Sequence, residues 1–153
     1  MEIKLKSVAI VKNSRGSPTD DYWGEVISEI ELCDHIPEEA FEGISHFSHL
    51  EIIYFLDKAE PGDIVFSGKP RGNPDYPVVG IFAQRKKDRP NRLGLCTVEL
   101  LKHKGRTLSV RYLDAINGTP VLDIKPAFKE YQPKGEIMQP FWVADLMKKY
   151  WAK

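Results

Sequence analysis

Cysteine is scarce in this chain, because Cys33 and Cys96 are the only two among its 153 residues. Two thiols cannot build a disulfide-rich scaffold or a four-cysteine zinc site. The sequence also lacks a long hydrophobic run, since no stretch approaches the ~20 apolar residues of a membrane span. The first residues contain no signal-peptide core. We therefore expect a cytoplasmic protein that contacts no membrane and keeps both thiols reduced.

Net charge is also absent, because 22 lysines and arginines balance 22 aspartates and glutamates. A neutral chain is not held to nucleic acid by bulk charge alone. The charges are unevenly distributed, however, since the segment 20–63 is strongly acidic and the segment 69–111 strongly basic. Two interpretations are open: a solvated surface with ion pairs between the segments, or a basic rim around a site for an anionic substrate.

The common signatures of catalysis are missing as well. The chain has no Walker-type phosphate loop, dinucleotide-binding fingerprint, HExxH motif or G-x-S-x-G nucleophile elbow. His46 and His49 are three residues apart but have no third ligand nearby, so we expect them to be ordinary polar residues. These absences argue against a metalloenzyme and against a hydrolase.

What the chain does contain is a series of alternating or β-branched segments separated by turn-forming residues. Such segments predict strands, here at 4–11, 26–32, 48–56, 78–83, 93–101, 107–113 and 120–124. Apolar residues at helical spacing predict a helix at 140–151. The Gly- and Pro-rich stretch 62–77 is typical of a long loop. The pattern favours one domain over 1–153 with a mainly β fold, either a sandwich or a closed antiparallel barrel, and a C-terminal helix.

Two segments are more polar than the elements that they interrupt. Residues 84–95 carry five basic side chains between two strands, and arginine forks suit carboxylates and phosphates. The alternative is a charged surface loop. In the segment 114–126, Gly118 suits a left-handed turn that lets a ligand approach the backbone. Asp123 and Lys125 either pair with each other or present one charge to a ligand.

Three stretches resemble one known family. His46–Leu50 (HFSHL) resembles its F-S-H-L segment, and Gly80–Leu95 resembles G-x-F-A-T-R-S-x-x-R-P-N-P-I-G-L. Asn117–Pro126 resembles D-G-T-P-V-L-D-I-K-P. The sequence is thus similar to the TrmO/TsaA-type family of S-adenosylmethionine-dependent methyltransferases, and the region of similarity spans more than half of the chain.

The resemblance implies a small antiparallel β-barrel that binds S-adenosylmethionine and forms a homodimer. It implies that the substrate is tRNA, in which characterised relatives methylate N6 of a threonylcarbamoyl-modified adenosine beside the anticodon. Position by position, it implies the cofactor contacts Leu56, Asp57, Arg85, Leu95, Gly118, Thr119, Pro120 and Val121. Arg89, Pro90 and Asn91 match the R-P-N core, which we place on the substrate side.

We expect methyl transfer in such a protein to depend on positioning rather than on a nucleophile or a metal ion. The leaving thioether needs no acid, and oriented reactants gain up to ~7–11 kcal/mol. Arg89 and Asn91 would orient the acceptor. Asp123 or a main-chain carbonyl would help to remove the proton from an adenine amine.

Some positions depart from the family pattern. Lys86–Asp88 replaces S-x-x, Arg92 stands in place of a proline, and Cys96 in place of a serine. Two alternatives to a tRNA enzyme therefore stay open. One is a methyltransferase of the same fold that acts on a small molecule or another RNA, and the other is a non-catalytic module that binds S-adenosylmethionine.

Overall fold

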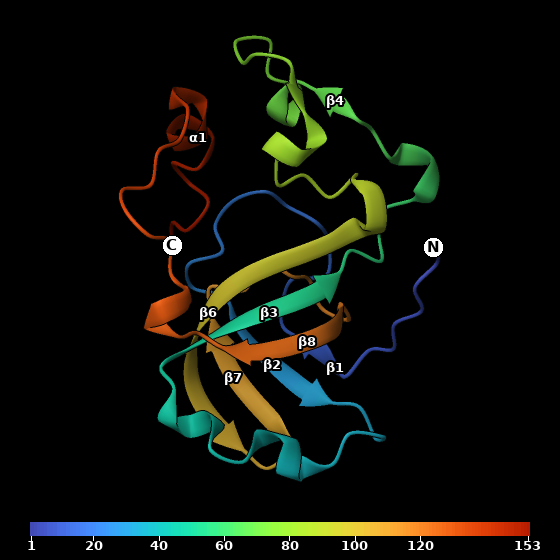
Figure 1. The fold of residues 1–153 in the computed structure, drawn as a ribbon, viewed down its shortest axis with the longest axis vertical. Helices are drawn as coiled ribbons and strands as arrows, with labels where there is room; N and C mark the ends of the chain where they lie inside the picture. The colour runs from blue at the N-terminus through green and yellow to red at the C-terminus, as the bar shows by residue number, and fades with distance from the viewer.

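Six antiparallel strands close into a barrel in the order β1-β2-β7-β6-β3-β8. The computed structural model describes all 153 residues. Its barrel strands are β1 (Ala9–Lys12), β2 (Ile27–Leu32), β3 (His49–Phe55), β6 (Leu93–Lys104), β7 (Thr107–Arg111) and β8 (Pro120–Pro126). Closure pairs every barrel strand on both sides, which leaves no sheet edge open. The expected mainly β fold and the closed barrel are confirmed, and Figure 1 shows the barrel in the lower half of the molecule.

The alternation of β3 explains why these residues form a barrel wall. Leu50, Ile52 and Tyr54 are buried, whereas the residues between them are exposed or half-buried. In the same way, β6 turns Cys96 and Val98 inward. The inward side chains of all six strands belong to one cluster of 15 buried residues. Burial of one large aliphatic side chain contributes about 1.5–3 kcal/mol, so this cluster is the main source of stability.

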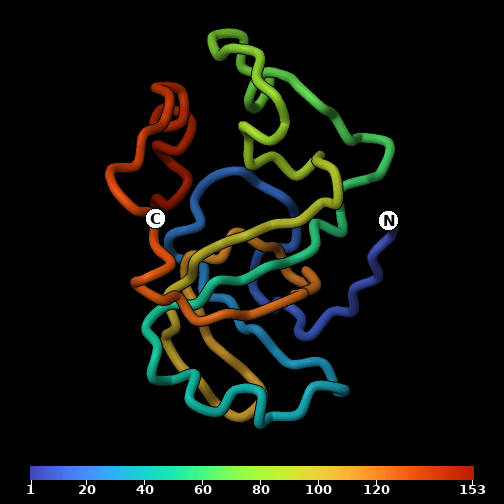
Figure 2. Tube along the Cα trace, viewed as in Figure 1, coloured from blue at the N-terminus to red at the C-terminus, as the bar shows by residue number.

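The residues between β3 and β6 form an arm beyond one end of the barrel, which the trace in Figure 2 follows. The arm contains two short strands, β4 (Ser67–Gly68) and β5 (Val79–Gly80), which pair antiparallel. The strand predicted at 78–83 is therefore reduced to two residues. The side chain of Gln84 is buried and donates to the carbonyl oxygens of Gly68 and Val79, at 3.0 and 3.1 Å. This side chain holds the two strands of the arm together.

Short 3-10 helices supply most of the remaining regular structure. They are η1 (Glu38–Phe41), η2 (Ile44–His46), η3 (Pro61–Asp63), η4 (Pro70–Gly72), η5 (Ile81–Ala83), η6 (Pro90–Arg92) and η7 (Lys129–Tyr131). Pro37 immediately precedes η1, as suits a residue whose fixed φ favours the start of a helical turn. None of the helices has the length and hydrophobicity that crossing a membrane requires.

The C-terminal helix is shorter than the sequence pattern predicts, because α1 covers only Phe141–Leu146. The following residues turn back toward the loop that precedes β2. Three consecutive amides of that loop donate to C-terminal carbonyls: Tyr22 to Lys149, Trp23 to Tyr150 and Gly24 to Ala152. These three carbonyls belong to residues that follow α1, and the amides of the N-terminal loop satisfy them.

Gly24 permits this close approach, because a Cβ at this position would lie 2.0 Å from the carbonyl oxygen of Trp151. The neighbouring Trp23 is buried, and the guanidinium carbon of Arg15 lies 4.0 Å from the centroid of its ring. The loop before β2 and the C-terminal residues are thus fastened to each other, although they lie at opposite ends of the sequence.

Candidate cofactor and substrate site

The end of β3 and the start of β6 bring several of the predicted cofactor contacts together. The last cross-strand pair is Phe55–Leu93, and the amide of Leu56 then donates to the carbonyl oxygen of Arg92 at 2.9 Å. The guanidinium of Arg85 donates to the carbonyl oxygen of Leu95. Leu56, Arg85 and Leu95 therefore share one neighbourhood, and Asp57 follows directly along the chain.

Outward-facing apolar side chains form a shelf beside these residues. Ile53 and Phe55 of β3 are the cross-strand neighbours of Leu95 and Leu93 of β6. Leu93 and Leu95 are 40% and 48% exposed. We call these four side chains the apolar shelf. It lies on the outer face of the barrel wall, and the inward-facing core lies behind it.

Asp123 lies in the same outward row as the shelf, because it is the neighbour of Ile53 on the other side of β3. Adjacent strands are ~4.8 Å apart, so about 10 Å separates the backbones of Asp123 and Leu95. Its carboxylate is 2.7 Å from Nζ of Lys125 and accepts from the amide of Ile124 at 2.9 Å. The hydrogen bond from Lys125 to Asp123, and then the charge of Asp123, raise the pKa of Lys125. Asp123 and Lys125 therefore pair with each other, which is one of the two alternatives that the sequence left open. The role of Asp123 as a proton acceptor stays a prediction.

The turn before β8 holds Gly118 in the left-handed region, with a φ of 87°, as its sequence context predicts. A Cβ at Gly118 would meet no atom within 4 Å, so the space beside this backbone is open. The side chains of Thr119 and Val121 are buried, and the hydroxyl of Thr119 donates to the carbonyl oxygen of Ile116 at 2.7 Å. Pro120 begins β8 and pairs with β1. Contacts from this turn to a ligand would therefore come from its backbone.

Arg89 and Asn91 lie at η6, the short turn that leads into β6. The Arg89 guanidinium donates to the carbonyl oxygen of Gln84 at 2.7 Å, which uses one of its five N–H groups. Asn91 and Arg92 both have positive φ, 62° and 49°. Arg92 donates to the carbonyl oxygen of Ala59 at 2.5 Å and stacks over the ring of Phe55. The turn is thereby held against the end of β3.

One residue that the sequence analysis did not single out, Asp114, organises the adjacent end of the barrel interior. The phenols of Tyr54 and Tyr150 both donate to its carboxylate, Tyr150 at 2.6 Å. The buried thiol of Cys96 donates to the carbonyl oxygen of Tyr112 at 2.9 Å. Burial, and then the charge of Asp114, raise the pKa of both phenols and of the thiol. The available signal was a carboxylate inside an otherwise apolar run.

Cys96 is a buried structural residue rather than a nucleophile, because only a thiolate attacks readily and its raised pKa keeps the thiol protonated. His49 accepts or donates one hydrogen bond with Ser48, at 2.8 Å. No three side chains of His, Cys, Asp and Glu converge into a group that could hold a metal ion.

The architecture is that of a small β-barrel domain in which two of the three matching stretches, 80–95 and 117–126, approach the end of β3, and the third, His46–Leu50, opens that strand. A family model described as the tRNA-methyltransferase O N-terminal domain matches residues 8–132, and the chain belongs to this family.

Relatives agree with this assignment. A probable S-adenosyl-L-methionine-binding protein of Methanothermobacter thermautotrophicus is 38% identical over 141 residues, which cover 88% of this chain and 97% of that protein. The human tRNA (adenine(37)-N6)-methyltransferase is 36% identical over 107 residues, or 68% of this chain and 23% of that protein. A crystal structure of TrmO from Pseudomonas aeruginosa has the same fold, with a TM-score of 0.74, 22% identity, and coverage of 90% of this chain and 61% of its own.

The extent of the match differs among the relatives. A probable S-adenosyl-L-methionine-binding protein of Archaeoglobus fulgidus is 35% identical over 130 residues, which cover 82% of this chain but only 34% of that protein. The chain therefore spans nearly the whole of some relatives and about a third or less of others.

Proposed function

We propose that this chain is an S-adenosylmethionine-dependent methyltransferase that modifies N6 of an adenosine in tRNA, with the threonylcarbamoyl-modified adenosine as the expected acceptor. The observation that carries the proposal is the family match over residues 8–132. The name of the human relative specifies N6 of an adenine in tRNA. The name of the Methanothermobacter relative specifies S-adenosyl-L-methionine.

The residues around the end of β3 suit the chemistry of S-adenosylmethionine. Cofactor sites have mainly apolar walls. In the apolar shelf, the exposed side chains of Leu93 and Leu95 can contact an adenine ring or a thioether in the same way. Arg85 supplies a guanidinium fork for the carboxylate of the methionine part. The carboxylate of Asp57 offers an acceptor for hydroxyl or ammonium groups, and the open space beside Gly118 leaves backbone groups accessible.

When bound, S-adenosylmethionine supplies a methyl group attached to a sulfonium. The tasks left to the chain are to hold the acceptor in line and to accept its proton. Arg89 has N–H groups to spare beyond its bond to Gln84, and the exposed Asn91 lies two residues further along. These two side chains orient the acceptor. Asp123, in the outward row of the apolar shelf, or a main-chain carbonyl receives the proton.

We further infer that residues 1–153 form one domain, because the C-terminal residues bond to the loop before β2. We also infer a homodimer in the cytoplasm. The large apolar side chains that the arm exposes, Phe66, Val78 and Phe82, support a surface shared with a second copy. The two free cysteines suit a reducing compartment. Sedimentation equilibrium of the purified chain tests the dimer.

Calorimetric titration of the purified chain with S-adenosylmethionine, alone and with total tRNA, tests the proposed function. A tRNA enzyme binds the cofactor, and the presence of tRNA changes that binding. A small-molecule methyltransferase binds the cofactor with no response to tRNA. A non-catalytic module binds the cofactor but transfers no methyl group to RNA or to a metabolite extract. Absence of cofactor binding under both conditions contradicts all three.

A further inference from the structure

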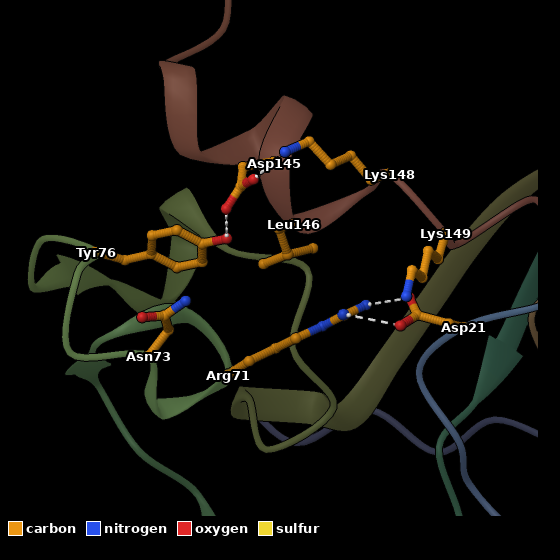
Figure 3. A pocket seen from close by; sticks show the side chains of 8 residues that line it. All are labelled: Asp21, Arg71, Asn73, Tyr76, Asp145, Leu146, Lys148 and Lys149. Carbon is orange, nitrogen blue, oxygen red and sulfur yellow. Dashed lines mark hydrogen bonds and ion pairs between the residues drawn. The ribbon is translucent and has the colours of Figure 1, made fainter.

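A pocket with a volume of about 210 Å³ lies between the arm and the C-terminal residues. Three segments line it: Asp21 before β2, the stretch Arg71–Tyr76 of the arm, and the stretch Asp145–Lys149 at the end of α1 and beyond. Figure 3 shows Arg71 reaching from the arm toward Asp21. Only one of the lining side chains that project into it, Leu146, is a large aliphatic group.

The carboxylates of this pocket already have partners. Asp21 accepts two hydrogen bonds from the Arg71 guanidinium, at 3.0 and 3.4 Å. Asp145 accepts from Lys148 at 2.6 Å and from the phenol of Tyr76 at 2.5 Å. These partners, Lys148 first, lower the pKa of Asp145, so it stays ionised, and each of its oxygens already accepts a hydrogen bond from within the pocket.

The polar groups without an internal partner are donors. Lys149 lines the pocket, and its ammonium takes part in none of the ion pairs or side-chain hydrogen bonds described above. The side-chain oxygen of Asn73 accepts from the amide of Asp75 at 2.9 Å. The NH₂ group of Asn73 has two donors; one is directed at the phenol of Tyr76, and the second is spare. Spare donors combined with occupied acceptors favour a ligand that brings acceptor oxygens.

Charge and size narrow the class of ligand. The lining has three cations and two carboxylates, and Asp20, which approaches Arg71 at 3.7 Å, brings the carboxylates to three. The charges therefore balance, and Lys149 is the one cation of the lining that has no carboxylate partner. The volume is below the ~300–1,000 Å³ that encloses a whole drug-sized ligand. The pocket is too small for S-adenosylmethionine or an entire nucleotide, and a single phosphate group suits it.

The pocket lies at the same end of the barrel as the motif residues. Lys149 precedes Tyr150, whose phenol shares the Asp114 carboxylate with Tyr54. Tyr54 in turn is the cross-strand neighbour of Gly94 and Val121. The pocket and the residues at the end of β3 are therefore connected through the Asp114 carboxylate.

We propose that this pocket binds a backbone phosphate of the RNA acceptor, with Lys149 and the NH₂ group of Asn73 as its donors. Free inorganic phosphate presents the same chemistry as a backbone phosphate. The choice of RNA as the source therefore rests on the proposed function. The contact anchors the acceptor strand next to the reaction site and carries no base specificity.

The first test compares tRNA affinity for the wild-type chain and for Lys149→Gln between 50 and 200 mM salt. A matched control is Lys4→Gln, because Lys4 is an exposed lysine before β1, outside the basic segment 69–111. Loss of one phosphate contact reduces the slope of log affinity against log salt by about 1. We expect this reduction, and a several-fold weaker affinity, for Lys149→Gln only, with the affinity for S-adenosylmethionine unchanged. Identical slopes for Lys149→Gln and the control overturn the proposal.

The second test separates this inference from the proposed function. Inorganic phosphate is titrated into ¹⁵N-labelled protein, and the side-chain amide resonance of Asn73 is followed. If phosphate shifts the Asn73 resonance in the wild type but not in Lys149→Gln, the pocket is an anion site. If the wild type also fails to bind tRNA, tRNA is removed as the acceptor. Methylation of tRNA, together with no response of Asn73 to phosphate and no effect of Lys149→Gln, refutes the pocket and leaves the proposed function standing.

Discussion

The phenol of Tyr150 donates a hydrogen bond to the carboxylate of Asp114 at 2.6 Å, close to the end of the chain. Asp114 also accepts from Tyr54, an inward-facing residue of β3. One carboxylate therefore joins the C-terminal residues to the barrel interior. This bond adds to the backbone hydrogen bonds that hold the same residues against the loop before β2.

Removal of the Tyr150 hydroxyl in Tyr150→Phe leaves the half-buried carboxylate of Asp114 with one donor fewer. Hydrogen bonds to charged groups contribute about 1.5–3 kcal/mol, and we expect the free energy of unfolding in urea to fall by this amount. Tyr131→Phe is the control, because Tyr131 is 80% exposed and should change stability by less than ~0.5 kcal/mol. Equal stability of Tyr150→Phe and wild type would show that the bond contributes nothing.

Alkaline pH should weaken the fold through the same cluster. Burial and the charge of Asp114 raise the pKa of Tyr54 and Tyr150 above the ordinary value, which is about 10 in an unfolded chain. The folded state therefore holds these protons more tightly, so their contribution is complete below about pH 10 and declines above it. We expect the free energy of unfolding to fall between pH 9.5 and 11, and to fall less in Tyr150→Phe. Parallel pH profiles for the two proteins contradict this.

The two thiols should differ in reactivity. Cys96 is buried, and burial followed by the charge of Asp114 raises its pKa, whereas Cys33 is only partly buried. We expect a disulfide-exchange reagent at pH 8 to modify Cys33 in the folded chain and to spare Cys96 until urea is added. Peptide mapping by mass spectrometry identifies the modified residue. Rapid labelling of Cys96 in folded Cys33→Ser would show that the thiol is accessible.

Gly118→Val tests whether a ligand approaches the backbone before β8. Gly135→Val is a matched control, because both glycines have positive φ, 87° and 80°, and neither Cβ would meet an atom within 4 Å. Left-handed backbone costs a side-chain-bearing residue roughly 1–2 kcal/mol, so both variants should lose similar stability. We expect calorimetry to show loss of S-adenosylmethionine binding in Gly118→Val alone. Normal affinity in that variant refutes the predicted contact.

Arg89→Ala should separate the acceptor side of the site from the cofactor side. We expect the methylation rate to fall about 10- to 100-fold, since misplacement of a reactant by 1 Å has this effect, while the affinity for S-adenosylmethionine stays nearly unchanged. Arg89 also bonds to Gln84 within the arm, so the variant's unfolding midpoint is measured alongside. An equal loss of cofactor affinity would place Arg89 on the cofactor side instead.

The sequence predicts most of the strands, because inward and outward residues of strands such as β3 alternate. Alternation alone left a sandwich and a closed barrel open, and the family resemblance implied the barrel. The predictions from sequence fail where tertiary contacts override local preference. The residues 147–151 have helical periodicity, yet the loop before β2 captures their carbonyls. The arm consists of turns set by Gly and Pro positions, and periodicity does not describe these. Contact between the acidic and basic segments, seen in the Asp21–Arg71 ion pair, also depends on the fold.

Candidate site residues were predictable only where motifs carried them. Arg85 and Leu95 lie in a matching stretch, Leu56 directly follows the strand that another matching stretch opens, and the structure brings the three together. Asp114 belongs to no such stretch, and its role follows from two phenols that are 96 residues apart in the chain. The pocket beside Lys149 likewise joins three segments that sequence alone does not connect.

Transfer of a labelled methyl group from S-adenosylmethionine to tRNA is the most direct measurement of the central claim. The purified chain is incubated with tRNA that carries the threonylcarbamoyl modification and with matched tRNA that lacks it, and nucleosides are identified by mass spectrometry. We predict label on N6 of the modified adenosine in the first tRNA and little in the second. Cofactor binding without methyl transfer to either tRNA would contradict the account.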